Sequence, residues 1–333
     1  MSRSIVSLAA AAWLLVNASL AAAQVAATVQ ASGVDKPEEI HVADVRRKLK
    51  ETFGSEDRIR KDALPRFQAL VLRQLVDQTL VLQALERDKL GVSREELNDE
   101  FALLKKTMDE TQPGKFEGYL KIYGYTEASR LRALAWELSW KRHLGRMTTE
   151  EAKAAYFQKH RRELDGTELR VSHILFKPAD PALPADIDAL ASQAQRVRRE
   201  IVDGKLSFED AVVKHSEGTK KDGGDLGFIG RHGSMPEPFA RAAFQLQKGQ
   251  ISEPVISSFG VHLIRCTDEK PGKKTLEDFE VADEVKLRLA RQLFEEIAAR
   301  ERNKAMADPK NPGVKFTGAA PYLKPGTDEL VMP

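Results

Sequence analysis

Histidines are the side chains of this sequence whose placement most suggests chemistry. Four of the seven lie in one stretch of the chain, at His173, His215, His232 and His262. A metal site is the first function to test, because imidazoles are common zinc ligands. Zinc ligands usually come as close pairs, and neither HxxxH nor CxxC occurs here. The sequence therefore predicts no metal site.

The glycine-rich stretch DGGDLGFIGRHGSMPEPF, residues 222–239, does not match a nucleophile elbow or a phosphate loop. No GxSxG motif is present, and Ser234 has no base at hand. The glycines fit neither GxGxxG nor GxxxxGK[ST], and Asp225 would repel a phosphate. Cys266 is the only cysteine. We interpret it as a small buried apolar residue, and we interpret the glycines as turns around a short strand.

Two of the histidines lie in sequences typical of buried strands. In LRVSHILF, residues 169–176, His173 shares a face with its neighbours two residues away, and in GVHLIRCT, residues 260–267, His262 does the same. Two imidazoles would then point inward from two strands. Periodicity alone favours two hydrogen-bonded core histidines. A paired network that fixes tautomers and orients a partner is the alternative.

Several segments follow one another between Leu169 and Thr267: HILF, KHSEG, GGDLGFIGRHGSMPEPFARAAFQLQKGQISEPV and FGVHLI. Together they resemble a parvulin-type peptidyl-prolyl cis-trans isomerase. The resemblance implies an α+β domain with a small antiparallel or mixed four-stranded sheet and helices. It also implies an enzyme that needs no cofactor.

The resemblance assigns roles to individual residues. His173 and His262 match the two family histidines, and Ser257 matches the family hydroxyl, so these three are the predicted catalytic residues. The predicted substrate-binding residues are Leu226, Met235, Phe239 and Phe259. Rotation about an X–Pro bond has a barrier of about 20 kcal/mol and requires no covalent intermediate. An apolar slot and a site that favours the twisted amide are sufficient.

One position departs from the family pattern. Parvulins often carry Cys or Asp shortly after the helix that here ends in KHSEG, and Gly218 stands at that place. Glu217 is one residue away from it. Weak catalysis is the expectation at this point. The basic cluster of phospho-specific parvulins is also missing after HILF, so we predict no preference for phosphoserine before proline.

The rest of the chain is predicted to be helical or extended. Residues 1–23 have the layout of a secretory signal, with cleavage expected after Ala23. Residues 24–165 predict an all-α domain, in which Pro37 is taken to start the first helix. Its segment LVDQTLVLQALERDKLGVSREELNDEF resembles the N-terminal region of SurA- and PrsA-type exported chaperones. The resemblance implies that residues 166–270 form the isomerase domain. Residues 271–333 predict a helix that docks on the N-terminal helices, and an extended tail.

The formal net charge of +2 gives no general attraction to nucleic acid, and no ATP motif is present. The predicted function is isomerisation of X–Pro bonds in unfolded or nascent exported polypeptides, with ATP-independent chaperone activity. The expected location is the periplasm or the exterior, as a soluble protein in contact with the exported-protein pathway. The main alternative is a holdase that keeps the fold with little catalysis. A structural protein with an incidental α+β domain is the third interpretation.

Overall fold

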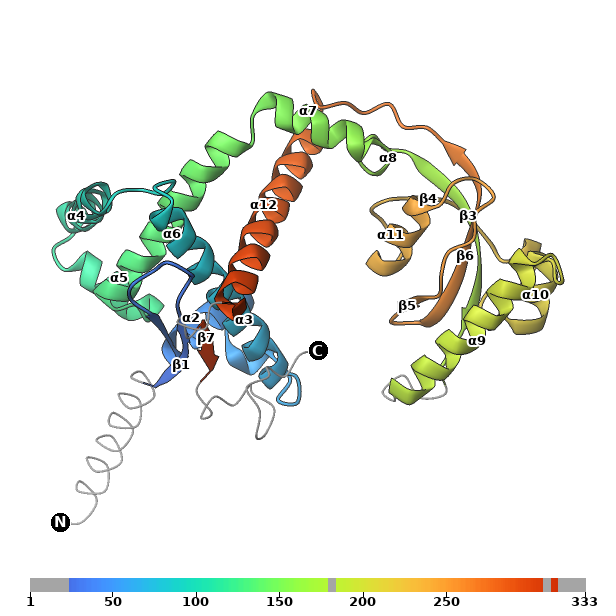
Figure 1. Cartoon of the computed structure of the whole chain (residues 1–333), viewed down its shortest axis with the longest axis horizontal. Coiled ribbons are helices and arrows are strands. Elements are labelled where there is room, and N and C mark those ends of the chain that lie inside the picture. The colour runs from blue at the N-terminus through green and yellow to red at the C-terminus, as the bar shows by residue number, and fades with distance from the viewer. Residues whose placement is uncertain (1–23, 179–183, 308–312, 317–333) are drawn as a thin grey trace, which may run out of the picture. The chain divides into compact units, whose positions relative to one another are not determined.

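The structure is a computed structural model that describes residues 24–178, 184–307 and 313–316 (Figure 1). Its contacts divide the chain into two compact units. Unit 1 is Met1–Thr149 with Ala290–Pro333, and unit 2 is Glu150–Leu289. The expected signal at residues 1–23 lies outside the described residues. The domain boundaries expected from the sequence stay a prediction.

Unit 2 is built around a four-stranded sheet in the order β4-β3-β6-β5, with every neighbouring pair antiparallel. This confirms the expected fold class. The strands are β3 (Glu168–Phe176), β4 (Asp225–Gly230), β5 (Val255–Ser257) and β6 (Gly260–Lys270). The helical elements are α7 (Glu150–Lys159), α8 (Arg161–Leu164), α9 (Pro184–Val202), α10 (Phe208–His215), η2 (Lys221–Gly223), α11 (Glu237–Gln245) and the start of α12 (Phe279–Ala307).

Alternation along β3 and β6 sends apolar side chains to both faces of this sheet. One face packs against α9 and α10, through Ile174, Phe176, Val261 and Leu263. The other face packs against α11, where Leu169, Val171, Ile264 and Cys266 share an apolar cluster with Phe239 and Phe244. Figure 1 shows α11 on the opposite side of the sheet from α9 and α10. The buried Cys266 fits the structural role predicted for it.

Local sequence signals explain where the helices of unit 2 begin. The Ser207 hydroxyl accepts a hydrogen bond from the Asp210 amide at 3.0 Å and so caps α10. Helix α11 begins after Pro236, where the missing N–H of a nearby Pro238 costs nothing. The buried residues of α11 are Phe239, Ala240, Ala243 and Phe244, which form one stripe at helical spacing. That stripe is the face that α11 turns toward the sheet.

Unit 1 is mostly helical. Its helical elements are α2 (Val42–Phe53), η1 (Glu56–Arg58), α3 (Leu64–Arg87), α4 (Arg94–Thr111), α5 (Lys115–Tyr123), α6 (Glu127–Met147) and residues 290–307 of α12. Residues Val81, Ala84 and Leu85 of α3 share an apolar cluster with Ile297 and Ala298 of α12. Beside this cluster, Glu301 is fully buried and receives two hydrogen bonds from Arg87, at 2.9 and 3.3 Å. These contacts join α3 to α12.

Unit 1 also contains a three-stranded sheet in the order β2-β1-β7, which the sequence analysis did not predict. Its strands are β1 (Val25–Val29), β2 (Glu38–His41) and β7 (Val314–Phe316). The expectation of a helix start at Pro37 was wrong, because β2 follows it and α2 begins only at Val42. The all-α description of this region therefore needs the small sheet added to it.

Within the described ranges, none of the helices combines the length and the apolar character that crossing a membrane requires.

Candidate active site

The imidazoles of His173 and His262 meet on the face of the sheet that α11 covers. His173 on β3 is opposite Ile264 of β6, and His262 is opposite Leu175. The two histidines are therefore diagonal neighbours on one face. Their Nδ1 atoms are 3.3 Å apart, and their rings lie 5.5 Å apart at 22°. The paired arrangement, rather than two separate core histidines, is what the structure shows.

Ser257 extends this pair into a chain of three polar side chains. Its Oγ lies 2.7 Å from His262 Nε2 and also accepts a hydrogen bond from the Phe259 amide at 3.1 Å. Two tautomer arrangements satisfy both side-chain contacts. In one the hydrogen bonds are donated from His173 through His262 to Ser257, and in the other they are donated from Ser257 through His262 to His173. A proton shift along it would convert one arrangement into the other.

Burial keeps both imidazoles neutral at pH 7. The side chains of His173 and His262 are buried on the sheet. Burial lowers the pKa of His173. Burial, and then the neighbouring His173, lowers the pKa of His262 to about 4. The pair therefore offers neutral hydrogen-bonding groups rather than a charge.

Phe239 of α11 closes over the two imidazoles. Its ring packs against both in T-shaped geometry, with centroids 5.9 Å apart at 77° for His173 and 5.2 Å apart at 82° for His262. Half-buried Leu226 and Met235 pack in the same apolar cluster as Phe239. The structure thus brings six of the seven predicted site residues together.

Phe259 is the exception, because its side chain is 59% exposed. Only its amide reaches the group described above, through the hydrogen bond to Ser257. A binding role for its ring stays a prediction.

Gly218 lies directly beside His173. A Cβ built on Gly218 would be 3.1 Å from His173 Nε2 and 3.2 Å from the Cβ of Leu175. The position at which the family pattern departs therefore faces the imidazole. The Glu217 carboxylate does not fill that space, because it accepts a hydrogen bond from the Lys177 amide at 3.2 Å.

Ser216 is a supporting residue that the sequence analysis missed. It is fully buried, and its Oγ accepts hydrogen bonds from the amides of Leu175 and Gly218, both at 3.2 Å. These bonds tie the segment after α10 to the end of β3. The only sequence signal was its place in KHSEG.

One glycine of the glycine-rich stretch, Gly224, is required because its backbone packs closely against the backbone of β3. The His173 amide donates a hydrogen bond to the Gly224 carbonyl at 3.0 Å. A Cβ on Gly224 would lie 2.4 Å from the His173 carbonyl oxygen, and φ at this residue is +77°. Only glycine meets both conditions. Asp225 turns the chain as expected, accepting from the Gly227 amide at 3.1 Å and pairing with Arg170 at 2.7 Å.

No group of three or more His, Cys, Asp or Glu side chains placed to hold a metal ion occurs in the part of the chain that the structure describes. The histidines of the site contact each other, a hydroxyl and aromatic edges. Such a site can bind an apolar group and hydrogen-bond to an amide.

Comparison with known proteins decides the family. Residues 173–268 match the family of rotamases described as the PPIC-type PPIASE domain. The peptidyl-prolyl cis-trans isomerase Pin1 of Malus domestica is 34% identical over 116 residues, which cover 31% of this chain and 95% of that protein. The chain belongs to the PPIC-type peptidyl-prolyl isomerase family. This PPIC-type assignment confirms the parvulin resemblance of the sequence.

The other relatives extend the likeness beyond the PPIC-type domain. Foldase protein PrsA of Halalkalibacterium halodurans is 28% identical over 232 residues, which are 64% of this chain. This chain spans 61% of that foldase's length. The crystal structure of the peptidylprolyl isomerase PrsA from Bacillus anthracis is 24% identical, with a TM-score of 0.34, over 71% of this chain and 97% of that one.

Proposed function

We propose that unit 2 is a peptidyl-prolyl cis-trans isomerase that acts on X–Pro bonds of unfolded polypeptide. One observation carries the proposal: Phe239 packs edge-on against both neutral imidazoles while sharing an apolar cluster with Leu226 and Met235. An apolar wall and neutral hydrogen-bonding groups then meet at one place. That is the combination a proline ring and its preceding amide require.

The chemistry follows from the amide itself. Its planar forms are stabilised by conjugation, and rotation through the twisted form costs about 20 kcal/mol. In the proposed mechanism Leu226, Met235 and Phe239 hold the pyrrolidine ring and exclude water from the bond. Water stabilises the dipolar planar amide, so its exclusion favours the twisted form. The enzyme accelerates the reaction to the extent that it binds this form better than either planar form.

The three polar residues supply hydrogen bonds that change with the amide. As conjugation is lost, the nitrogen becomes a better acceptor and the carbonyl oxygen becomes less negative. The chain Ser257–His262–His173 can present either a donor or an acceptor, because its two tautomer arrangements are both satisfied. We assign it the role of adjusting to the amide during rotation, with no covalent step.

The substrates that fit this site are unfolded or nascent exported polypeptides that contain proline. The signal-like residues 1–23 and the likeness to PrsA foldases support an exported, periplasmic or secreted location. The helical unit 1 is proposed to add ATP-independent chaperone activity. That assignment rests on its resemblance to exported chaperones.

The second candidate function is a holdase with little catalysis, and Gly218 is the observation that favours it. No side chain at residue 218 contacts His173 Nε2, and the carboxylate of Glu217 is bonded elsewhere. The apolar slot would still bind proline-containing segments. Binding with an unchanged isomerisation rate is the outcome that would select this alternative.

A protease-coupled assay on an Ala-Pro tetrapeptide tests the proposal. The full chain is expected to accelerate cis-trans exchange, and the double variant Leu226→Ala with Met235→Ala should lose about tenfold or more in kcat/KM. Leu206→Ala is the matched control, because Leu206 packs on the opposite face of the sheet. If the natural chain does not accelerate the exchange, the proposal that it is an isomerase is wrong. If the double variant keeps full activity, Leu226 and Met235 do not form the binding site for the proline ring.

A further inference from the structure

The loop that carries Met235 is closed by an ion pair between its two ends. Arg231 follows β4, and Glu237 begins α11. The Arg231 guanidinium donates two hydrogen bonds to the Glu237 carboxylate, both at 2.7 Å. Between the ends, residues 232–234 are exposed. This two-bond ion pair between Arg231 and Glu237, called the fork below, therefore fixes the position of the loop and of Met235 at the start of α11.

The short helix α8 holds this fork from outside the loop. Glu163 Oε2 accepts a hydrogen bond from Arg231 Nε at 3.3 Å. The adjacent Arg162 reaches the other end of α11, where it donates to the carbonyl oxygens of Phe244 at 3.1 Å and Leu246 at 2.5 Å. Arg162 thus contacts the C-terminal end of α11, and Glu163 contacts Arg231, which pairs with Glu237 at the start of that helix.

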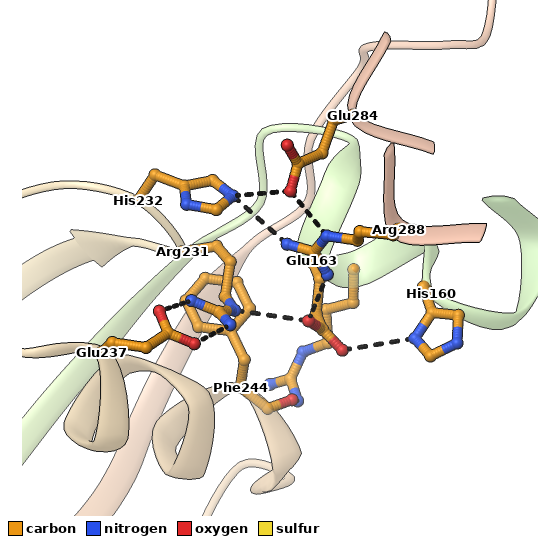
Figure 2. Close-up of polar contacts among 9 residues, drawn as sticks. His160, Glu163, Arg231, His232, Glu237, Phe244, Glu284 and Arg288 are labelled. Atoms are coloured by element: carbon orange, nitrogen blue, oxygen red, sulfur yellow. Dashed lines mark hydrogen bonds and ion pairs between the residues drawn. The ribbon is translucent and has the colours of Figure 1, made fainter. Parts of the chain in front are cut away.

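The start of α12 fixes α8 in turn, as Figure 2 shows. Arg288 donates to Glu163 Oε2 at 2.9 Å and to Glu284 at 2.6 Å. The apolar side of the contact joins Leu164 to Val281 and Val285. Glu163 is therefore the carboxylate at which α8, the loop and α12 meet. His160 approaches its other oxygen at 3.5 Å.

The charges of this network are satisfied only while the network is assembled. The Arg231 side chain is 7% exposed, so an unpaired guanidinium there would be costly. Burial alone would raise the pKa of Glu163, but its contacts with Arg288, His160 and Arg231 outweigh burial and hold that pKa below its usual range. Breaking the network would leave a buried guanidinium unpaired, so its pairings stabilise the position of the start of α11.

We propose that Arg162, Glu163 and Arg231 are positioning residues for the isomerase site, because together they hold both ends of α11 and the loop bearing Met235. The proposal rests on the proposed isomerase function for its kinetic consequences. Arg162 and Glu163 precede the segment that matches the family, residues 173–268. Two of the three positioning residues therefore lie outside the segment that matches the family, and Arg231 lies within it.

The test uses two conservative variants of the full chain. Arg231→Lys keeps the charge but cannot form the fork, and Glu163→Gln keeps the shape but removes the shared charge. The control is Glu209→Gln, which removes the negative charge from a 2.5 Å ion pair with Arg265, a residue that packs over Phe208 of α10. The chain has six methionines, so a spectrum of 13C-methyl methionine is sparse enough to follow Met235.

We expect both variants to raise KM about tenfold with a smaller change in kcat, because a displaced slot weakens substrate and transition state alike. We also expect the Met235 methyl resonance to shift or broaden in both variants of the folded protein. Arg231→Met should raise KM more, and change the Met235 resonance more, than Arg231→Lys does. Glu209→Gln should leave KM and the resonance unchanged.

Three results would overturn the proposal. They are an unchanged Met235 resonance in Arg231→Lys and Glu163→Gln, an unchanged KM in both, or changes of equal size in Glu209→Gln. If the natural chain shows no isomerase activity, the proposed function fails by itself. The Met235 resonance then decides the positioning role without any kinetic measurement.

Discussion

His173 and His262 stand on neighbouring strands with their Nδ1 atoms 3.3 Å apart, and neither has an acidic partner among the contacts of its ring. Each imidazole instead contacts the other and the edge of Phe239. Their buried environment lowers the pKa of both, so the pair is uncharged at pH 7. The site therefore differs from a general acid–base pair, in which one of the two groups is protonated at neutral pH and can donate its proton.

Stability should fall in acid because of His262. Its pKa is about 4 in the folded state and near 6.5, the ordinary value for histidine, when unfolded, so the unfolded state binds the proton first. The contribution is fully present above pH 6.5 and is lost as the pH falls toward 4. By linkage, the free energy of unfolding should drop by about 3 kcal/mol from this group. Urea denaturation across this range measures the drop. His262→Gln should show a shallower dependence, and an identical slope would contradict the assignment.

Ser257→Ala should reduce catalysis more than it reduces stability. The variant removes the hydroxyl 2.7 Å from His262 Nε2, so His262 loses the partner that can either donate to it or accept from it. We expect a loss of about 1 kcal/mol in the free energy of unfolding. We expect kcat/KM to fall about tenfold or more. Ser258→Ala, at the neighbouring exposed residue, is the control. Equal kinetics in the two variants would remove Ser257 from the site.

Gly218→Asp should raise the pKa of His173. The new carboxylate would start from a Cβ only 3.1 Å from His173 Nε2, and a nearby negative charge favours the protonated imidazole. An NMR titration of the ring protons should show a higher pKa for His173 than in the natural chain. Gly218→Asn has nearly the same shape without the charge and should leave the titration close to that of the natural chain. A rise of the same size in the Asn variant would attribute the effect to crowding instead.

Glu301→Gln should destabilise unit 1. Glu301 is fully buried and accepts two hydrogen bonds from Arg87 on α3. Loss of the charge should cost about 2 kcal/mol of unfolding free energy. Thermal unfolding of the variant measures this, with Glu295→Gln, at an exposed residue of the same helix, as the control. A midpoint equal to that of the control would mean that the buried charge contributes nothing.

Much of the isomerase site could be predicted because its sequence signals are local. Alternation along LRVSHILF and GVHLIRCT placed each histidine on the inward face of a strand. The distance between the two rings could not be predicted, because it depends on register. A bulge between Arg170 and Val171 shifts the pairing of β3 with β6 and sets which residues face each other. The alternation of apolar and polar residues along a strand does not reveal where such a bulge occurs.

Contacts between distant segments were the part that could not be predicted. The fork between Arg231 and Glu237 depends on the path of the loop between them, and Glu163 joins it from before β3. The sheet of unit 1 was missed for a similar reason. Its strand β1 consists of two valines, two alanines and a threonine without a strong pattern. Its partner β7 lies near the other end of the described chain.

The pairing of β1 with β7 has a consequence for the order in which the protein folds. Unit 2 is one continuous stretch of chain, whereas unit 1 needs strands from residues 25–29 and 314–316. During synthesis or export that starts at the N-terminus, every residue of unit 2 is available before β7 emerges. We expect the isomerase unit to reach its native state first, while β1 still lacks a neighbour along one edge. A proline isomerase that matures early would be present while the rest of its own chain is still folding.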